Sequence, residues 1–149
     1  DRNPVARRRL FEVAGSLGYA MASYVSSRAF VAESVTIGPN AFILENNVLQ
    51  AGVSIGENTI LWSGNHIGHR SSVGSDTYIT SHVVISGYCE VGARCFIGVN
   101  ACMADRTSLP NDSTLAIGSV LRMTARDTGT YAGHPARKMP SRGGSAHGS

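Results

Sequence analysis

An aliphatic residue recurs every six positions along most of this 149-residue chain. A period of six fits neither an α-helix, which repeats every 3.6 residues, nor a free strand, which alternates every two. It is typical of a solenoid in which three short strands and three turns make one 18-residue coil. The series contains only Val, Ile, Leu and Met: Val31, Ile37, Ile43, Leu49, Ile55, Leu61, Ile67, Val73, Ile79, Ile85, Val91, Ile97, Met103, Leu109, Leu115 and Leu121.

Two further positions of the hexapeptide are also restricted. Four residues after each aliphatic position stands a small or β-branched residue, which we expect to point inward; Cys89 and Cys95 occupy such positions. The residue directly after the aliphatic is often glycine, and we expect it to supply an unusual backbone conformation in a turn: Gly38, Gly56, Gly68, Gly74, Gly92 and Gly98. These features predict an all-β chain, a parallel β-helix whose coils bury their core only against neighbouring coils.

The two ends of the chain depart from the repeat. Asn3 and Pro4 predict a helix with an Asn cap and Pro at its first position, and Gly18 is a natural stop. We expect residues 7–9, three arginines, on the solvated side of this helix, although an anion-binding patch is a second interpretation. We expect the opposite, core-facing side to be the apolar one, formed by Leu10, Val13, Ala14 and Leu17.

We expect four segments along the chain. Residues 1–30, with a short strand over residues 19–25, are expected to be the C-terminal remnant of a small α/β domain. We expect residues 31–126 to form the β-helix, residues 127–140 a closing segment, and residues 141–149 a flexible tail.

Composition excludes several classes of protein. The formal net charge is +3, but residues 31–126 contain seven acidic and five basic residues, so the positive charge lies at the ends and is no nucleic-acid footprint. No apolar run approaches the ~18 residues that span a membrane. The three cysteines form no C-x-x-C pair, which argues against a disulfide framework or a zinc knuckle and favours a cytoplasmic protein.

Three segments resemble bacterial sugar acetyltransferases of the hexapeptide-repeat superfamily, of the sialic acid O-acetyltransferase and UDP-amino-sugar N-acetyltransferase types. Residues 62–69, Trp-Ser-Gly-Asn-His-Ile-Gly-His, followed by Val73-Gly74, resemble their active-site coil. Residues 95–100, Cys-Phe-Ile-Gly-Val-Asn, resemble the next coil, and residues 133–137, Gly-His-Pro-Ala-Arg, their closing segment. The resemblance implies a left-handed β-helix and acetyl transfer to an amino or hydroxyl group of a sugar for surface-polysaccharide synthesis. It also implies that residues 1–30 are the remnant of a nucleotide-sugar-binding domain and that residues 127–140 lie on the CoA side.

The resemblance also implies a site between the subunits of a homotrimer. Its general base aligns with His69, and its cosubstrate is acetyl-CoA. The thioester pocket aligns with Tyr78, Val99, Ile117 and Gly118, and Lys138 or Arg137 is expected to meet the CoA phosphates. In related N-acetyltransferases a carboxylate follows the base, whereas Arg70 follows it here. We therefore expect Asp76, or an acid of the partner subunit, to orient His69.

The residues themselves suggest further candidates. An acyl transfer needs a base that titrates near neutral pH, which favours histidine, and a backbone N–H such as that of Gly87 for the oxyanion. His66 is an alternative base or a substrate ligand. His82 and Asn100 stand 18 residues apart and are expected either to line a groove for substrate or to bond to each other. Asn65 is a third candidate for substrate contact.

Two other functions use the same architecture. One is a non-catalytic scaffold that kept the solenoid without the chemistry. The other is a metalloenzyme of the γ-carbonic anhydrase type, in which His66, His69 and His82 would bind zinc with contributions from two subunits. We expect no metal, because the sugar-transferase segments argue against this alternative.

Overall fold

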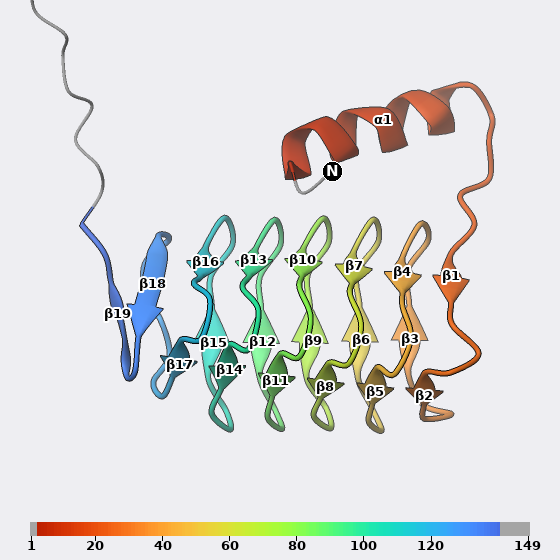
Figure 1. The fold of residues 1–149 in the computed structure, drawn as a ribbon. Helices are drawn as coiled ribbons and strands as arrows, with labels where there is room; N and C mark the ends of the chain where they lie inside the picture. The colour runs from red at the N-terminus through yellow and green to blue at the C-terminus, as the bar shows by residue number, and fades with distance from the viewer. Residues whose placement is uncertain (1–2, 141–149) are drawn as a thin grey trace, which may run out of the picture.

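Parallel strands stack in three sheets along one axis in the computed structural model, which describes residues 3–140 (Figure 1). Sheet A contains β1 (Tyr24–Val25), β4 (Phe42–Ile43), β7 (Ile60–Leu61), β10 (Tyr78–Ile79), β13 (Phe96–Ile97), β16 (Thr114–Leu115), β18 (Thr130–Gly133) and β19 (Ala136–Lys138). Sheet B contains β2 (Phe30–Val31), β5 (Val48–Leu49), β8 (His66–Ile67), β11 (Val84–Ile85), β14 (Cys102–Met103) and β17 (Val120–Leu121). Sheet C contains β3 (Thr36–Ile37), β6 (Ser54–Ile55), β9 (Ser72–Val73), β12 (Glu90–Val91) and β15 (Ser108–Leu109).

The strand register confirms the predicted 18-residue coil. From β1 to β17 each strand pairs in parallel with the strand 18 residues away, as Ile85 does with Ile67 and Met103. In β2 to β17 the second residue of each strand is the aliphatic of the series, and from Ile43 onward all of these side chains are buried. The chain is therefore a parallel β-solenoid of hexapeptide repeats whose core is a stack of aliphatic side chains.

The three corners of the solenoid position most of the polar groups discussed below. The A–B corner, between sheets A and B, includes residues 63–64, 81–82, 99–100 and 117–118. The B–C corner includes residues 69–70, 87–88 and 105–106, and the C–A corner includes residues 57–58, 75–76, 93–94 and 111–112. Side chains at the same corner of successive coils are neighbours because they lie 18 residues apart.

The hexapeptide glycines have a different role from the one expected. Positive φ angles fall at the corners, three residues after the aliphatic, and mostly on other residue types such as Asn40 and Asn58. Gly38 and Gly74 have no left-handed backbone; a Cβ on Gly38 would lie 2.6 Å from the backbone nitrogen of Glu57. These glycines are required because the next coil's backbone approaches too closely for a side chain.

Helix α1 (Pro4–Ser16) begins as predicted but packs through the side that we expected in solvent. The Asn3 side chain accepts hydrogen bonds from the N–H groups of Val5 and Ala6. The expected apolar face is largely exposed, with Leu10 at 70% of its full surface, whereas Arg7 is 8% exposed. Helix α1 therefore lies against the solenoid through arginines, over the C–A corner turns (Figure 1).

Two arginines attach α1 to the C–A corner. Arg7 donates to the carbonyl oxygens of Asn58 and Asp76, and its guanidinium lies 5.7 Å from the Tyr78 ring centre. Arg8 binds the Asp76 carboxylate through Nε and Nη2, the latter at 2.6 Å, and Glu57 at 2.8 Å. Asp76 is only 3% exposed, so it is a buried anchor for the helix and lies at a different corner from His69. The expectation that Asp76 orients His69 is therefore wrong within one chain.

Removing this anchor tests how α1 is held. In Asp76→Ala we expect amide exchange in α1 to accelerate by about an order of magnitude or more, because a hydrogen bond to a charged group contributes roughly 1.5–3 kcal/mol. Hydrogen exchange by mass spectrometry reads this directly. Asp112→Ala is the matched control, since Asp112 also pairs with an arginine at the C–A corner but contacts Arg94. Equal exchange in both variants would show that α1 is held by other contacts.

The closing segment ends the solenoid. After β17 the repeat stops, and β18 continues sheet A beside β16, with Tyr131 opposite Leu115. Strand β19 folds back antiparallel on β18. Residues 141–149, expected to be a flexible tail, lie outside the described residues. Among residues 3–140 no helix is long and apolar enough to cross a membrane.

Candidate active site

His69 is an exposed side chain at the B–C corner, directly after strand β8. Its backbone N–H donates to the side-chain oxygen of Gln50, and its carbonyl accepts from the N–H of Tyr88 on the next coil. The Tyr88 ring stands edge-on to the imidazole at a centroid distance of 5.0 Å. The base implied by the resemblance is therefore accessible to a substrate and held on a rigid corner.

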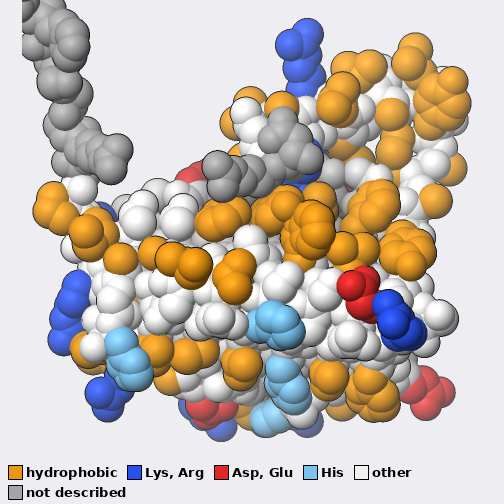
Figure 2. All heavy atoms as spheres, viewed as in Figure 1, with side chains coloured by type: hydrophobic (Ala, Val, Ile, Leu, Met, Phe, Trp, Pro, Cys, Tyr) orange, Lys and Arg blue, Asp and Glu red, His pale blue; other side chains and the backbone are white. Residues whose placement is uncertain are grey.

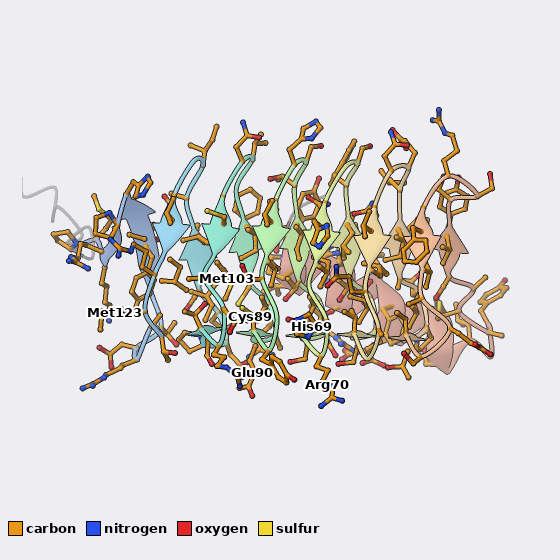
Figure 3. The ribbon with its side chains drawn as sticks, turned by 90° about the horizontal axis from the view of Figure 1, so that it is seen from below. His69, Arg70, Cys89, Glu90, Met103 and Met123 are labelled. Atoms are coloured by element: carbon orange, nitrogen blue, oxygen red, sulfur yellow. The ribbon has the colours of Figure 1, made fainter. Side chains whose placement is uncertain are left out.

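Two cationic side chains flank the same tyrosine. The Arg70 guanidinium lies 5.8 Å and that of Arg106 4.3 Å from the centre of the Tyr88 ring. All three residues have positive φ, at 55° for Arg70 and Tyr88 and 58° for Arg106. This conformation recurs at the corners of the solenoid, so it reflects the turn geometry and does not distinguish these three residues. Figure 3 shows His69 beside Arg70, which extends away from the solenoid.

The other histidine candidates lie elsewhere around sheet B. His66 points outward from β8 and is half-buried, while His82 is exposed at the A–B corner, one sheet away from His69. Figure 2 shows histidine side chains gathered on this face of the molecule. Among residues 3–140 no group of three His, Cys, Asp or Glu side chains is arranged to hold a metal ion.

The A–B corner brings together five of the other expected site residues. His82 and Asn100 follow each other along the corner, and neither accepts a hydrogen bond from the other in the described chain. The His82 ring lies over Gly64, whose absent Cβ would be 2.8 Å from His82 Nδ1. Val99 and Ile117 stand on adjacent coils beside them, with Gly118 next, and Ile117 is 74% exposed.

Tyr78 belongs to a row of aromatic side chains on the outer face of sheet A. It stacks on Phe96 at 5.8 Å and accepts a hydrogen bond of 2.6 Å from the Trp62 indole N–H. This row lies beneath α1, and Figure 2 shows hydrophobic side chains collected there.

Asn65 cannot contact a substrate, which corrects the sequence-based expectation. It points into the solenoid and is 1% exposed. Its amide donates to the carbonyl of Trp62 and its oxygen accepts from the N–H of Val83. Asn65 therefore satisfies backbone groups inside the coil, which is what an inward polar residue must do.

The C-terminal end of the solenoid carries a cationic hollow of about 250 Å³, lined by Arg122, Met123, Pro135, Ala136 and Arg137. Figure 3 labels Met123 at this end. Lys138 instead lies beside Asp127, at 3.7 Å between charged atoms. Arg137 is thus better placed than Lys138 to meet a phosphate in this hollow.

The cysteines differ in their access to reagents. Burial raises the pKa of the Cys95 thiol to about 11, and Cys89 is also buried, whereas Cys102 points outward from sheet B. We expect a polar thiol reagent at pH 8 to modify one cysteine per folded chain and none in Cys102→Ser. Mass spectrometry after digestion identifies the site, and modification of Cys95 in the native protein would contradict this assignment.

Sequence reasoning overlooked Tyr88, Asp105 and Arg106. Each of them stands 18 or 36 residues after His69 or Arg70, so the 18-residue register alone places them at the same corner. The 18-residue spacing is visible in the sequence, but it identifies these residues only after His69 has been taken as the base.

Comparisons with known proteins agree with this fold. Residues 34–69 match the family model for the bacterial transferase hexapeptide (six repeats). A histidine-to-asparagine variant of perosamine N-acetyltransferase from Caulobacter crescentus, solved with CoA and GDP-perosamine, is 21% identical with a TM-score of 0.92, covering 95% of this chain and 67% of that one. The acetyltransferase domain of PglB from Neisseria gonorrhoeae FA1090 is 26% identical with a TM-score of 0.90, covering 93% of this chain and 68% of that one.

A more distant neighbour carries the same architecture. UDP-N-acetylglucosamine O-acyltransferase from Moraxella catarrhalis is 16% identical with a TM-score of 0.51, covering 78% of this chain and 72% of that one. The chain therefore carries the hexapeptide repeat of bacterial transferases and has the β-helix fold of sugar acetyltransferases.

Proposed function

We propose that this chain is an acetyl-CoA-dependent acetyltransferase that acts on an amino or hydroxyl group of a sugar, either nucleotide-linked or free. The observation that carries the proposal is the exposed imidazole of His69 beside Gly87, on the fold of sugar acetyltransferases. Similar proteins were solved with acetyl coenzyme A, or with CoA and GDP-perosamine. We further propose a role in the cytoplasmic synthesis of bacterial surface polysaccharide.

His69 acts as the general base in this proposal. The acceptor nitrogen or oxygen attacks the thioester carbonyl of acetyl-CoA and gives its proton to the imidazole. The tetrahedral intermediate then collapses, so that a C–N or C–O bond has formed, the C–S bond breaks, and the proton passes to the departing thiolate. Imidazole suits this cycle because it both accepts and returns a proton near neutral pH.

Gly87 supplies the donor for the oxyanion. Its N–H donates to no acceptor within residues 3–140, and the His69 ring lies over this residue. A preorganised N–H next to the base stabilises the negative charge that develops on the carbonyl oxygen.

A trimer would complete the site. In one chain, His69 stands at the B–C corner and Val99 and Ile117 at the A–B corner, with the width of sheet B between them. A threefold assembly can face one subunit's B–C corner with the next subunit's A–B corner, so that the base meets the thioester pocket. Light scattering at micromolar concentration should therefore give three times the chain mass, and a monomer would contradict the shared site.

Acetyl-CoA would lie in the groove between two subunits, along the A–B corner. Val99, Ile117 and Gly118 offer an apolar surface for the pantetheine arm, with Tyr78 as the remaining candidate, and His82 and Asn100 face the acceptor. Arg122 and Arg137 of the C-terminal hollow supply positive charge for phosphates.

Calorimetry with acetyl-CoA separates an enzyme from a scaffold. We expect saturable binding at one site per chain, which Ile117→Glu weakens because it places a charge on the thioester side of the groove. Absence of acetyl-CoA binding by the folded trimer would favour the non-catalytic scaffold, and stoichiometric zinc in the purified protein would favour a metalloenzyme.

A further inference from the structure

Two other side chains occupy the space where a side chain on Gly87 would lie. Its φ lies outside the left-handed region, and the neighbouring coils carry His69 and Asp105 at the equivalent position, so the backbone tolerates a side chain there. A Cβ on Gly87 would lie 2.6 Å from His69 Nε2 and 3.0 Å from Asp105 Oδ1. The imidazole and the carboxylate thus approach one point from opposite sides.

Asp105 forms a surface ion pair with the neighbouring Arg106. Its Oδ2 faces Arg106 Nε at 3.4 Å, which leaves Oδ1 on the side of Gly87. Arg106 lies over the face of Tyr88, and Tyr88 stands edge-on to His69. A chain of contacts thus runs from Asp105 through Arg106 and Tyr88 to His69, and both ends of this chain approach Gly87.

We infer that Asp105 is the positioning residue for His69, an inference that rests on the proposed acetyl transfer. Arg70 occupies the position after the base, and its guanidinium is directed to Tyr88, so the adjacent residue supplies no carboxylate. Asp105 provides one from two coils away, where one water molecule can bridge its Oδ1 and the ring edge that carries Nε2. It orients the imidazole and stabilises the imidazolium that forms when the acceptor loses its proton.

Kinetics of Asp105→Asn test this role. We expect kcat to fall about 10–100-fold, the usual effect of removing the partner of a functional histidine, with KM for acetyl-CoA unchanged. Asp105→Glu keeps the carboxylate and should retain more activity than Asp105→Asn. The matched control is Asp112→Asn, another exposed corner aspartate paired with an arginine, whose kcat should equal that of the wild type. Wild-type kcat in Asp105→Asn would overturn the inference.

A second measurement does not depend on activity. In protein labelled with ¹⁵N-histidine, the ring resonances of His69 should move in Asp105→Asn and stay in place in Asp112→Asn, with His82 and His134 as internal references. Unchanged His69 resonances in Asp105→Asn would overturn the inference. If no acceptor is acetylated at all, the proposed function fails, and the resonances still decide whether Asp105 acts on His69.

Discussion

We expect His69→Ala to lower kcat by about 10²–10⁴-fold and to leave the dissociation constant of acetyl-CoA close to that of the wild type. The substitution removes the group that accepts the proton of the acceptor, whereas the assigned CoA contacts lie at the A–B corner and the C-terminal hollow. His69 is exposed, so the loss of its side chain should not unfold the solenoid. Steady-state thiol release gives kcat, and calorimetry gives the dissociation constant.

Two other histidine variants control for this result. His134→Ala, on the closing hairpin, should retain wild-type kcat because it is remote from the B–C corner. His66→Ala tests the alternative base on the same strand. Most activity retained in His69→Ala together with its loss in His66→Ala would assign the base to His66.

The largest stability effect is expected at the core. Ile85→Ala should lower the free energy of unfolding by about 2–5 kcal/mol, the cost of a buried cavity after Ile-to-Ala truncation. Ile85 is fully buried and packs in the stack between Ile67 and Met103. A solenoid coil is stabilised only by its two neighbours, so a void in one coil weakens both interfaces. Chemical denaturation followed by circular dichroism measures the difference.

Glu90→Ala is the control for the core variant. Glu90 shares the coil of Ile85 but points outward from sheet C, where Figure 3 shows it at the rim. Its truncation should change the unfolding free energy by about 0.5 kcal/mol or less. Equal losses in the two variants would contradict the inward and outward assignment of the hexapeptide positions.

The solenoid could be predicted because every coil repeats the same pattern of inward-pointing residues. One aliphatic and one small residue in every six residues fix which side chains point inward, and the structure follows that register from Ile43 to Leu121. The helix could be predicted from its cap but its packing could not. Arg7 is buried only because Asn58 and Asp76 present oxygens at the C–A corner, a contact between residues far apart in sequence.

The site was predictable only in part for a similar reason. A motif identifies His69, but the corner on which each residue lies requires the 18-residue register to be applied to all three sheets. In that register His69 lies at the B–C corner and His82 at the A–B corner. Asp76 lies at the C–A corner, where it binds α1 and not the base. The hexapeptide repeat specifies the coil of one chain. It does not specify how the B–C corner of one subunit would meet the A–B corner of the next.

The most direct test is release of CoA thiol from acetyl-CoA in the presence of nucleotide-linked amino sugars or free sialic acids. The account predicts that at least one acceptor accelerates thiol release above the rate without acceptor, with one acetylated sugar formed per thiol, and that His69→Ala abolishes this acceleration. No acceptor-dependent release from folded trimer that binds acetyl-CoA, or full release from His69→Ala, would contradict it.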